Sequence, residues 1–382
     1  MNGSFSFRLP KEIFFGTGEG RKTGAYLRAI ASRFLVVTGK TAVRRYGVLA
    51  EVMESLGNES LQWEVFDEVE PEPSLRTINR ALEHARGFQA EGVVSLGGGS
   101  VLDCGKAVAG LVAADSPVEP FFDGQSLPPA GVPWIAMPTT AGSGSEMTNN
   151  AVLSDPERML KKSLRGPSLL ARLVIVDPLY TEFMDPYVTA TSGVDALVQA
   201  IEACTGPQVN PVVDVLSREA IRLLWTYLPE AVRAGDNRGV REYVARGSVL
   251  SAMAFSNSSS GPAHGLSHMV GPEYGIPHGE ACGLFLPQVI RYNKEVLSER
   301  YRALFQTLFG DQDPGRDPVE AFIYAWQAFL DTIGLRRRLR DFGATEENLS
   351  GVVQDERIGR SIKENQRPMT HDDLIDLLRE VL

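Results

Sequence analysis

The fold of the first half is decided at residues 92–110, which read GVVSLGGGSVLDCGKAVAG. An apolar segment typical of a buried strand ends in three consecutive glycines, and Ser100 after them can cap a helix. Glycines have no Cβ atom to keep a pyrophosphate away from the backbone, and unpaired N–H groups at a helix start form an anion site. The spacing differs from G-x-G-x-x-G, and a tight turn without a ligand would use the same glycines. Their place between a strand and a capped helix favours phosphate binding.

Strand and helix signals alternate along the first 178 residues at the pace of a parallel α/β sheet. The segment GTGEGRKTG, residues 16–24, is interpreted as a turn before a helix at Thr23, because no Val- or Ile-rich strand precedes it. Alternation around residues 147–153 and 159–164 predicts a hairpin. The strands of the sheet are predicted at residues 5–15, 34–39, 61–69, 134–137 and 173–176.

The strand signal ends at Pro178, and helical periodicity continues from there to the C-terminus. The chain is also longer than a single hydrophobic core usually allows. We therefore predict an α/β domain over residues 1–178 and an all-helical domain over residues 179–382. The first helices are predicted at residues 186–203, 212–232 and 240–255.

Three of the five histidines in the chain lie within GPAHGLSHMVGPEYGIPHG, residues 261–279. His264 and His268 are spaced i, i+4 and share one helix face, and a Gly-Ile-Pro turn can return His278 toward them. A zinc peptidase would carry a Glu after the first His, and none is present. Such a cluster favours a metal or proton-transfer site over histidines that only pack or cap. Cys282, four residues after His278, is interpreted as a packing residue.

Composition limits the partners and the compartment. A net charge of -10 and a pI near 5.2 argue against nucleic acid and anionic membranes as partners. The sequence has neither an apolar run long enough to span a bilayer nor a segment of signal-peptide type. Its three cysteines are far apart, as expected for free thiols in a reducing compartment. We expect a cytoplasmic protein.

Several long motifs, in the same order, resemble those of the iron-dependent (group III) alcohol dehydrogenase family. The resemblance implies a dinucleotide-binding α/β domain followed by an α-helical metal-binding domain, the architecture also found in dehydroquinate synthase. It also implies NAD(P)-dependent interconversion of small alcohols with aldehydes or ketones, in a homo-oligomer for which a dimer is our first expectation. The motifs are LPKEIFFGTG, GGGSVLDCGKA, MPTTAGSGSEMT, LVIVDP, SGVDALVQAIEA, HGLSH, IPHGEACGLFLP and NQRPMT.

The resemblance also assigns residues to the two sites. The pyrophosphate is expected on the glycine turn, the rest of the cofactor on the loop after the next strand, and its nicotinamide end near Lys161. The cofactor-binding candidates are Gly39, Gly97, Gly98, Gly99, Ser100, Asp103, Thr139, Thr140, Ser143 and Lys161. The family's metal ligands fall on Asp195, Gln199, His264 and His278. The ion would lower the pKa of the alcohol, and His268 is the catalytic candidate that shuttles the proton or only supports a ligand.

Gln199 departs from the family, which usually has a histidine at this position. Asp195 and Gln199 are still i, i+4, so the shared helix face survives. An amide oxygen is a poorer donor than imidazole for late transition metals, and Asp195 alone is left to neutralise a dication. The site is therefore expected to bind its divalent ion, iron first and zinc as the alternative, more weakly, or to function without metal.

The end of the first βα unit bears on cofactor choice. Family members that prefer NAD often carry an Asp at the position of Gly39, where a carboxylate repels a 2′-phosphate. Here Gly39 is followed by Lys40, Arg44 and Arg45, which predicts that NADP is accepted and preferred over NAD. Two other functions stay open. One is a lyase similar to dehydroquinate synthase, which would need a basic cluster that is not evident near the histidines. The other is a retired nucleotide-binding module.

Overall fold

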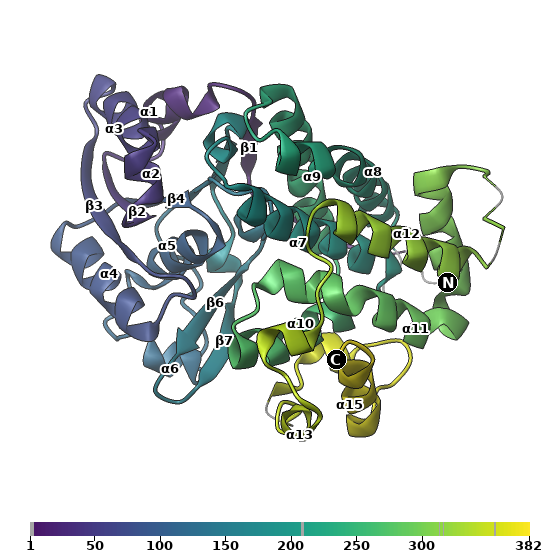
Figure 1. The fold of residues 1–382 in the computed structure, drawn as a ribbon. Coiled ribbons are helices and arrows are strands. Elements are labelled where there is room, and N and C mark those ends of the chain that lie inside the picture. The colour runs from purple at the N-terminus through teal and green to yellow at the C-terminus, as the bar shows by residue number, and fades with distance from the viewer. Residues whose placement is uncertain (1–3, 208–209, 313, 316, 355–356) are drawn as a thin grey trace. The chain divides into compact units, whose positions relative to one another are not determined.

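The structure, a computed structural model, describes residues 4–207, 210–312, 314–315, 317–354 and 357–382 (Figure 1). Contacts along the chain divide it into two compact units, Arg8–Phe183 and Met184–Leu382, and the second includes the described residues before Arg8. We call them the α/β unit and the helical unit and describe each by itself. Among the described residues, none of the helices combines the length and apolar character that crossing a bilayer requires.

A six-stranded sheet in the order β1-β8-β5-β4-β2-β3 forms the centre of the α/β unit, and all neighbouring strands are parallel. This confirms the predicted fold class. The strands are β1 (Glu12–Phe15), β2 (Arg33–Gly39), β3 (Gln62–Val69), β4 (Gly92–Gly97), β5 (Trp134–Pro138) and β8 (Leu173–Val176).

The opening strand is shorter than the predicted range of residues 5–15. It begins only at Glu12, after Pro10, which has no N–H to donate to a strand ladder. Phe7 packs instead on Ala203 and Val213 of the helical unit. Phe7 therefore belongs to a second core, which periodicity alone does not reveal.

Alternate residues of each strand point to opposite sides of the sheet, and helices cover both of these faces. The longer helices are α1 (Thr23–Leu27), α3 (Val48–Asn58), α4 (Leu75–Gly87) and α5 (Gly99–Leu111). Phe34 and Val94 share a buried cluster with α1 and α3, whereas Ser95 faces α5. A Cβ atom on Gly105 of α5 would lie 1.9 Å from Ser95 Oγ, so only glycine allows this close approach. Short pieces are α2 (Ala42–Arg45), α6 (Glu119–Phe122), η1 (Glu19–Lys22), η3 (Pro167–Leu169) and η4 (Pro178–Thr181).

The strand order changes direction between β2 and β4. The chain leaves β2 for β3 on one side, whereas β4 lies on the other side of β2 and continues to β5. In open α/β sheets ligands bind outside the carboxyl ends of the strands at such a switch point. Gly39 and Gly97 are the last residues of these two strands, so the topology brings both cofactor-binding candidates to one edge.

The prediction that Ser100 caps α5 is wrong. The N-cap is Gly98, in extended conformation, and no side chain caps this helix end among the described residues. Ser100 is the second residue of the helix, after Gly99. Its hydroxyl accepts a hydrogen bond from the N–H of Glu72 at 3.1 Å. The N–H groups of the first turn of α5 therefore have no side-chain cap, as an anion site requires.

Lys106 of α5 fixes the loop that follows β5. Its side chain is fully buried, and Nζ donates to Ser145 O at 2.8 Å, Thr148 Oγ1 at 2.9 Å and Asn150 O at 2.6 Å. Ser145 lies in η2 (Ser145–Met147), Thr148 directly follows it, and Asn150 begins the predicted hairpin. This hairpin is confirmed as antiparallel β6 (Asn150–Asp155) and β7 (Leu160–Arg165). A buried ammonium requires such a set of acceptors, so the loop is held at one position on α5.

Two acidic residues complete the Lys106 cluster. Asp103 accepts from Ser145 Oγ at 2.5 Å and from the N–H of Val152 at 3.0 Å. Glu146 is 4% exposed, and burial raises its pKa to about 7 although Lys106 acts in the opposite direction. Burial likewise lowers the pKa of Lys106, to about 8. The cluster therefore contains a carboxyl that changes its charge near neutral pH.

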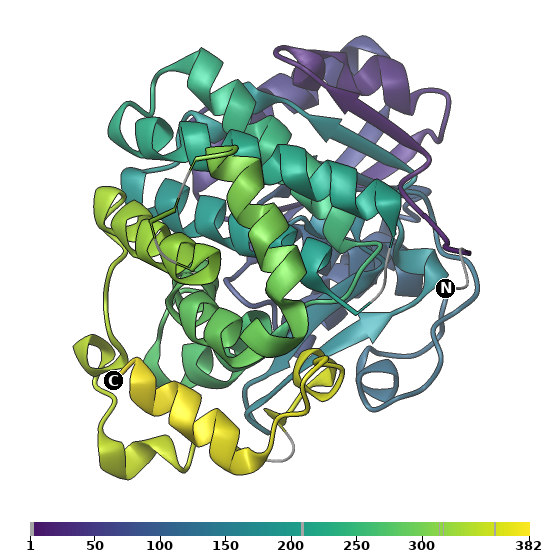
Figure 2. The same ribbon diagram turned by 90° about the vertical axis from the view of Figure 1, so that its right-hand side faces the viewer.

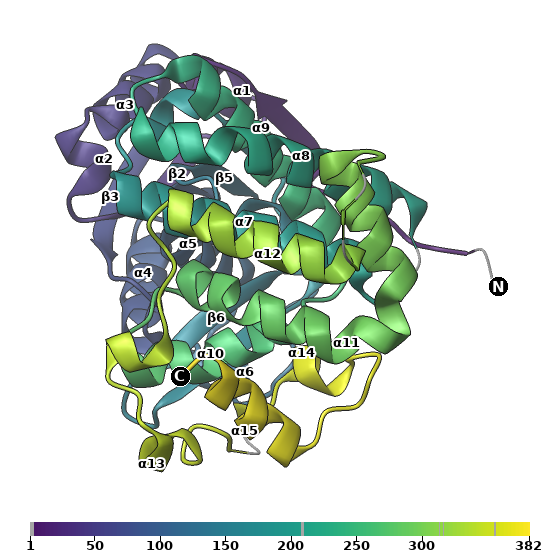
Figure 3. The same ribbon diagram turned by 45° about the vertical axis from the view of Figure 1, so that its right-hand side comes forward.

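The helical unit confirms the three helices predicted first and adds several more. The long helices are α7 (Pro186–Thr205), α8 (Pro211–Arg233), α9 (Arg238–Phe255), α10 (Pro262–Tyr274), α11 (His278–Phe309), α12 (Pro318–Thr332) and α15 (His371–Glu380). The short ones are η5 (Leu339–Phe342), α13 (Glu346–Leu349) and α14 (Arg360–Lys363). α11 packs on α7, α10 and α12, and the C-terminal segment packs α15 on α11 and α13 (Figures 2 and 3).

A tight turn joins α10 to α11 and places the third histidine. Gly275 has φ of 66°, a left-handed conformation that suits glycine, and the N–H of Ile276 returns to Gly271 O at 3.1 Å. Pro277 is the N-cap residue of α11, and His278 is the first residue of that helix. The Gly-Ile-Pro turn returns His278 to the other two histidines, as predicted: its ring centroid lies 5.4 Å from that of His264 and 5.0 Å from that of His268.

We expect Glu146→Gln to change how the stability of the α/β unit depends on pH. Because the folded-state pKa of Glu146 is raised, the folded protein retains this proton between about pH 4.5 and 7 while the unfolded chain loses it. Wild type should therefore lose stability across this range relative to the variant, by about 3 kcal/mol at most, and the difference should stay level above it. Urea unfolding at a series of pH values measures this difference.

Glu157→Gln is the matched control, because this glutamate is exposed in the turn of the β6–β7 hairpin. It should follow wild type at every pH. A difference between Glu146→Gln and wild type that does not grow between pH 4.5 and 7 would contradict the assignment.

Candidate functional site

A cavity of about 770 Å³ lies at the switch point of the sheet. It is lined by the ends of β2 and β4, by the glycine turn and by the start of the loop after β5, where the N–H of Thr139 donates to Gly97 O at 3.0 Å. The size suits a large part of a dinucleotide. Lining residues that matter below are Gly39, Lys40, Arg76, Gly97, Gly98 and Thr139.

The loop after β5 packs directly on the glycine turn. A Cβ atom on Gly98 would lie 3.3 Å from Thr140 Cγ2, and one on Gly99 would lie 2.7 Å from Ser143 Oγ. Gly99 therefore cannot carry a side chain without a shift, whereas Gly98 has marginal room. The structure brings the predicted residues Thr140 and Ser143 against the predicted phosphate turn.

The remaining cofactor candidates of the α/β unit have partners within the protein. Lys161 Nζ forms an ion pair with Glu72 at 2.6 Å, and Ser100 binds the backbone of the same Glu72. Asp103 binds the loop through Ser145 and Val152. The roles of these three residues in cofactor binding stay predictions.

Side chains from three helices of the helical unit converge on a second site. Asp195 of α7, His264 of α10, and His278 and Cys282 of α11 each offer a ligand atom, and these atoms all lie within 4.8 Å of one another. Asp195 Oδ1 is 3.3 Å from His264 Nε2 and 3.8 Å from His278 Nε2. The structure thus brings together three of the four predicted metal ligands.

Glu202, seven residues after Asp195 on α7, orients His264. Its buried carboxylate accepts from His264 Nδ1 at 2.5 Å and from the N–H groups of Gly261 at 2.8 Å and Ala263 at 2.7 Å. With Nδ1 carrying the proton, Nε2 presents its lone pair to the ligand group. His264 Nε2 is buried and makes no hydrogen bond among the residues that the structure describes. This is the arrangement that a metal-bound histidine needs.

Ser267 orients His278 in the same way. Its hydroxyl donates to His264 O at 2.8 Å, so its oxygen is left to accept from His278 Nδ1, 3.1 Å away. His278 Nε2 then faces Asp195 and Cys282 as an acceptor. Both Nδ1 atoms are thereby engaged, which leaves the two Nε2 atoms beside a carboxylate to bind an ion, and the residues present fit a divalent ion.

The charged groups of the cluster shift one another's pKa values. Burial raises the pKa of Asp195, but the positive charge available on His278 and His264 outweighs burial and lowers it overall. Burial also raises the pKa of Cys282, and the same two imidazoles bring it down to about 7. Burial lowers the pKa of His264, while Cys282 and Glu202 raise it well above its usual value. Without a metal ion these pKa shifts keep a positive charge on the imidazoles, and a divalent ion would displace the Nε2 protons when it binds.

Gln199 and His268 lie next to this cluster. Gln199 is buried one turn after Asp195, and its Nε2 donates to Asp195 Oδ1 at 3.2 Å. His268 is exposed, and its ring stacks on that of His278 with centroids 5.0 Å apart. Both residues are therefore close to ligand atoms, and the roles assigned to them stay predictions.

Sequence reasoning missed two residues of the site. Glu202 stands in the quoted segment SGVDALVQAIEA, and its spacing of seven from Asp195 on one helix was the available signal. Cys282 was expected to pack as an apolar residue, but its Sγ lies 3.7 Å from His278 Nε2. Its spacing of four from His278 placed it on the same helix face.

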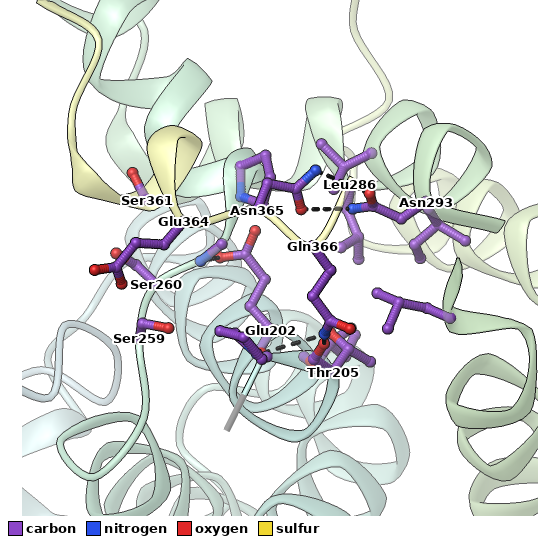
Figure 4. A pocket seen from close by; sticks show the side chains of 18 of the residues that line it. Glu202, Thr205, Ser259, Ser260, Leu286, Asn293, Ser361, Glu364, Asn365 and Gln366 are labelled. Carbon is purple, nitrogen blue, oxygen red and sulfur yellow. Dashed lines mark hydrogen bonds between the residues drawn. The ribbon is translucent and has the colours of Figure 1, made fainter. Parts of the chain in front are cut away.

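Glu202 also lines a small cavity of about 30 Å³, which has room for water but not for a dinucleotide (Figure 4). Two amides of the predicted motif NQRPMT close this cavity. Asn365 exchanges hydrogen bonds with Asn293 of α11, and Gln366 Nε2 donates to Thr205 O at 3.0 Å (Figure 4). This late motif therefore supports the helices that carry the ligand group.

Comparison with known proteins identifies the family. The family described as "Iron-containing alcohol dehydrogenase" matches residues 10–178. The family described as "Fe-containing alcohol dehydrogenase family, C-terminal" matches residues 189–382. The chain is 33% identical to a protein named probable alcohol dehydrogenase EutG from Salmonella typhimurium, over 97% of this chain and 93% of that protein.

Solved structures agree with this assignment. The alcohol dehydrogenase from Oenococcus oeni has a TM-score of 0.94 and 28% identity, covering 99% of this chain and all of that one. Sulfoacetaldehyde reductase from Bifidobacterium kashiwanohense, solved in complex with NAD+, has a TM-score of 0.90 and 29% identity, covering 99% of this chain and 98% of that one. The chain belongs to the iron-containing alcohol dehydrogenase family of nicotinamide-dependent oxidoreductases.

Proposed function

We propose that the protein transfers a hydride between NADP or NAD and a small alcohol or its carbonyl product, with the assistance of a divalent ion. The observation that carries this proposal is the ligand group in which His264 and His278 present Nε2 beside Asp195. The relatives named as alcohol dehydrogenases and aldehyde reductases support the same substrate class.

The ion would be held by Asp195, His264 and His278, which keep the family's ligand residues. When bound there, a divalent ion supplies a Lewis acid that polarises the substrate oxygen and favours its alkoxide. Glu202 and Ser267 hold the imidazoles in position through Nδ1. His268, exposed and stacked on His278, is placed to pass a proton to solvent.

The glycine turn and the cavity at the switch point would hold the dinucleotide, with its pyrophosphate at the N–H groups of α5. Lys40 and Arg76 are exposed, line this cavity and have no carboxylate partner among the described residues. They are available for a 2′-phosphate beside Gly39. Arg44, which the sequence grouped with Lys40, is paired with Asp67 at 2.6 Å.

Hydride transfer is favoured over the two other functions considered. The matched families and relatives are dehydrogenases and reductases rather than lyases. A retired nucleotide-binding module would have no need for two histidines whose Nδ1 atoms are separately fixed by Glu202 and Ser267. We further propose a cytoplasmic homodimer, for which analytical ultracentrifugation of the purified chain is the test.

The phosphate turn is tested by Gly98→Val. Gly98 has φ of -77° and ψ of -175°, which a valine adopts readily, and its side chain would project toward Thr140. We expect the affinity for NADPH, measured by fluorescence titration, to fall by about tenfold or more while the melting temperature changes little. Gly87→Val is the control, because a Cβ atom there meets nothing within 4 Å. Unchanged affinity in folded Gly98→Val protein would overturn the assignment.

Cofactor choice is tested by Gly39→Asp. A Cβ atom at Gly39 would lie 3.5 Å from Val69 O, an ordinary contact, so the variant should fold. Wild type should have a higher kcat/KM with NADP than with NAD, and the new carboxylate should move this ratio toward NAD by about tenfold. Lys40→Ala should weaken NADP alone. A clear advantage of NAD in wild type would refute the prediction.

Metal dependence is tested by elemental analysis together with activity after chelation. Asp195→Ala should reduce the bound ion to background, since it removes the only carboxylate of the ligand group. Gln199→His should tighten binding by roughly tenfold or more, on the scale of changes around metal ligands. Asp236→Ala, an exposed carboxylate of the helical unit, is the control. Full activity in a rigorously metal-free preparation would contradict the metal mechanism.

A further inference from the structure

Cys282 lies among the ligand atoms, although no family position assigns it a role. It follows His278 by one turn of α11, so both side chains leave the same helix face. Its side chain is fully buried, and Sγ lies 3.7 Å from His278 Nε2. A buried thiol that only packs would have apolar neighbours, whereas this one lies within 4.8 Å of a carboxylate oxygen and two imidazole nitrogens.

We propose that the Cys282 thiolate is the fourth protein ligand of the divalent ion, in place of Gln199, and that the resulting Asp-His-His-Cys set favours zinc. This inference rests on the proposed function, in which Asp195, His264 and His278 hold the ion. It replaces the family's third imidazole with a sulfur donor from a different helix.

The distances fit such a site. With zinc bonds of about 2.3 Å to sulfur and 2.0–2.1 Å to nitrogen, tetrahedral ligands lie about 3.6 Å apart for sulfur and nitrogen. The observed separations are 3.7 Å between Cys282 and His278 and 3.3 Å between Asp195 and His264. His264 is only 3% exposed. Its Nε2 makes no hydrogen bond among the described residues and points into the same group. Asp195 and His278 are 3.8 Å apart and all four atoms lie within 4.8 Å of one another, so the longest separation has to shorten by roughly 1 Å for them to share one ion.

Gln199 has a supporting position in this arrangement. Its Nε2 donates to Asp195 Oδ1 at 3.2 Å and so holds the carboxylate in position, as Glu202 and Ser267 hold the imidazoles. Only the buried Oε1 of this amide has lone pairs for a metal, and a carbonyl-type oxygen suits harder ions, whereas a thiolate suits zinc.

The chemistry of the donor set also favours Cys282. A carboxylate and a thiolate together neutralise a dication, which Asp195 alone cannot do. Sulfur is a soft donor that selects zinc over harder ions such as Mn²⁺ or Mg²⁺, and it restores the softness lost when an amide replaces imidazole. The thiol of Cys282 thus compensates for the imidazole that is missing at position 199.

Cobalt substitution tests the sulfur bond directly. The full chain is stripped with chelator, reloaded with one equivalent of Co²⁺ and examined for the near-ultraviolet charge-transfer absorption of a cobalt–thiolate bond. We expect this band in wild type and in Cys204→Ser, whose thiol lies on α7 and outside the ligand group. Cys282→Ser should lack the band and bind Zn²⁺ at least tenfold more weakly.

A double variant separates ligand exchange from general damage. Gln199→His in the Cys282→Ser background should regain the zinc affinity, because the family's third imidazole returns, but should still lack the charge-transfer band. If Cys282→Ser fails to fold, X-ray absorption of zinc-loaded wild type decides, since the inference requires one sulfur neighbour at about 2.3 Å.

The two proposals fail in different ways. If wild type binds one ion that Asp195→Ala abolishes, but shows no sulfur neighbour and no loss of affinity in Cys282→Ser, the role of Cys282 is overturned and the metal function stands. If wild type binds no ion, or Asp195→Ala binds it equally well, the metal function falls and the role of Cys282 falls with it.

Discussion

The helical unit depends on one buried carboxylate. Glu202 of α7 accepts the first two free N–H groups at the start of α10 and the Nδ1 proton of His264. A Cβ atom at Gly261 would lie 2.6 Å from Glu202 Oε1, so the helix start can approach only because this residue is glycine. One acid thereby joins two helices, fixes the tautomer of a histidine and aims its Nε2 at the ligand group. Removing it would leave buried N–H donors without a partner, which folded proteins avoid.

The sequence predicted the architecture well because the architecture depends on periodicity. Strand β8 coincides with the predicted residues 173–176, and the three first helices fall where the 3.6-residue pattern placed them. The ends of elements were less predictable. Ser100 was assigned to cap α5, but the N-cap is Gly98, because a serine after three glycines gives no information on where the helix begins. Phe7 looked like part of the first strand and packs on the helical unit.

The site was predictable where one helix carries two of its residues and less so where helices must meet. The spacing of Asp195 and Gln199, and of His264 and His268, follows from helix geometry alone. The position of Cys282 near both histidines depends on how α11 starts beside α7, where a Cβ atom on Gly279 would lie 2.0 Å from Thr191 O. No local pattern reports such an approach. Family resemblance supplied the ligand set, and the structure supplied the neighbours of each ligand.

The buried Lys106 also constrains how the chain is made. Its acceptors in the loop after β5 lie 39 to 44 residues later in the sequence. An ammonium without such partners is costly to bury. At synthesis rates of about 5–20 residues per second, these acceptors are made roughly 2–9 s after Lys106. Burial of Lys106 therefore has to wait until the chain has been made at least as far as Asn150.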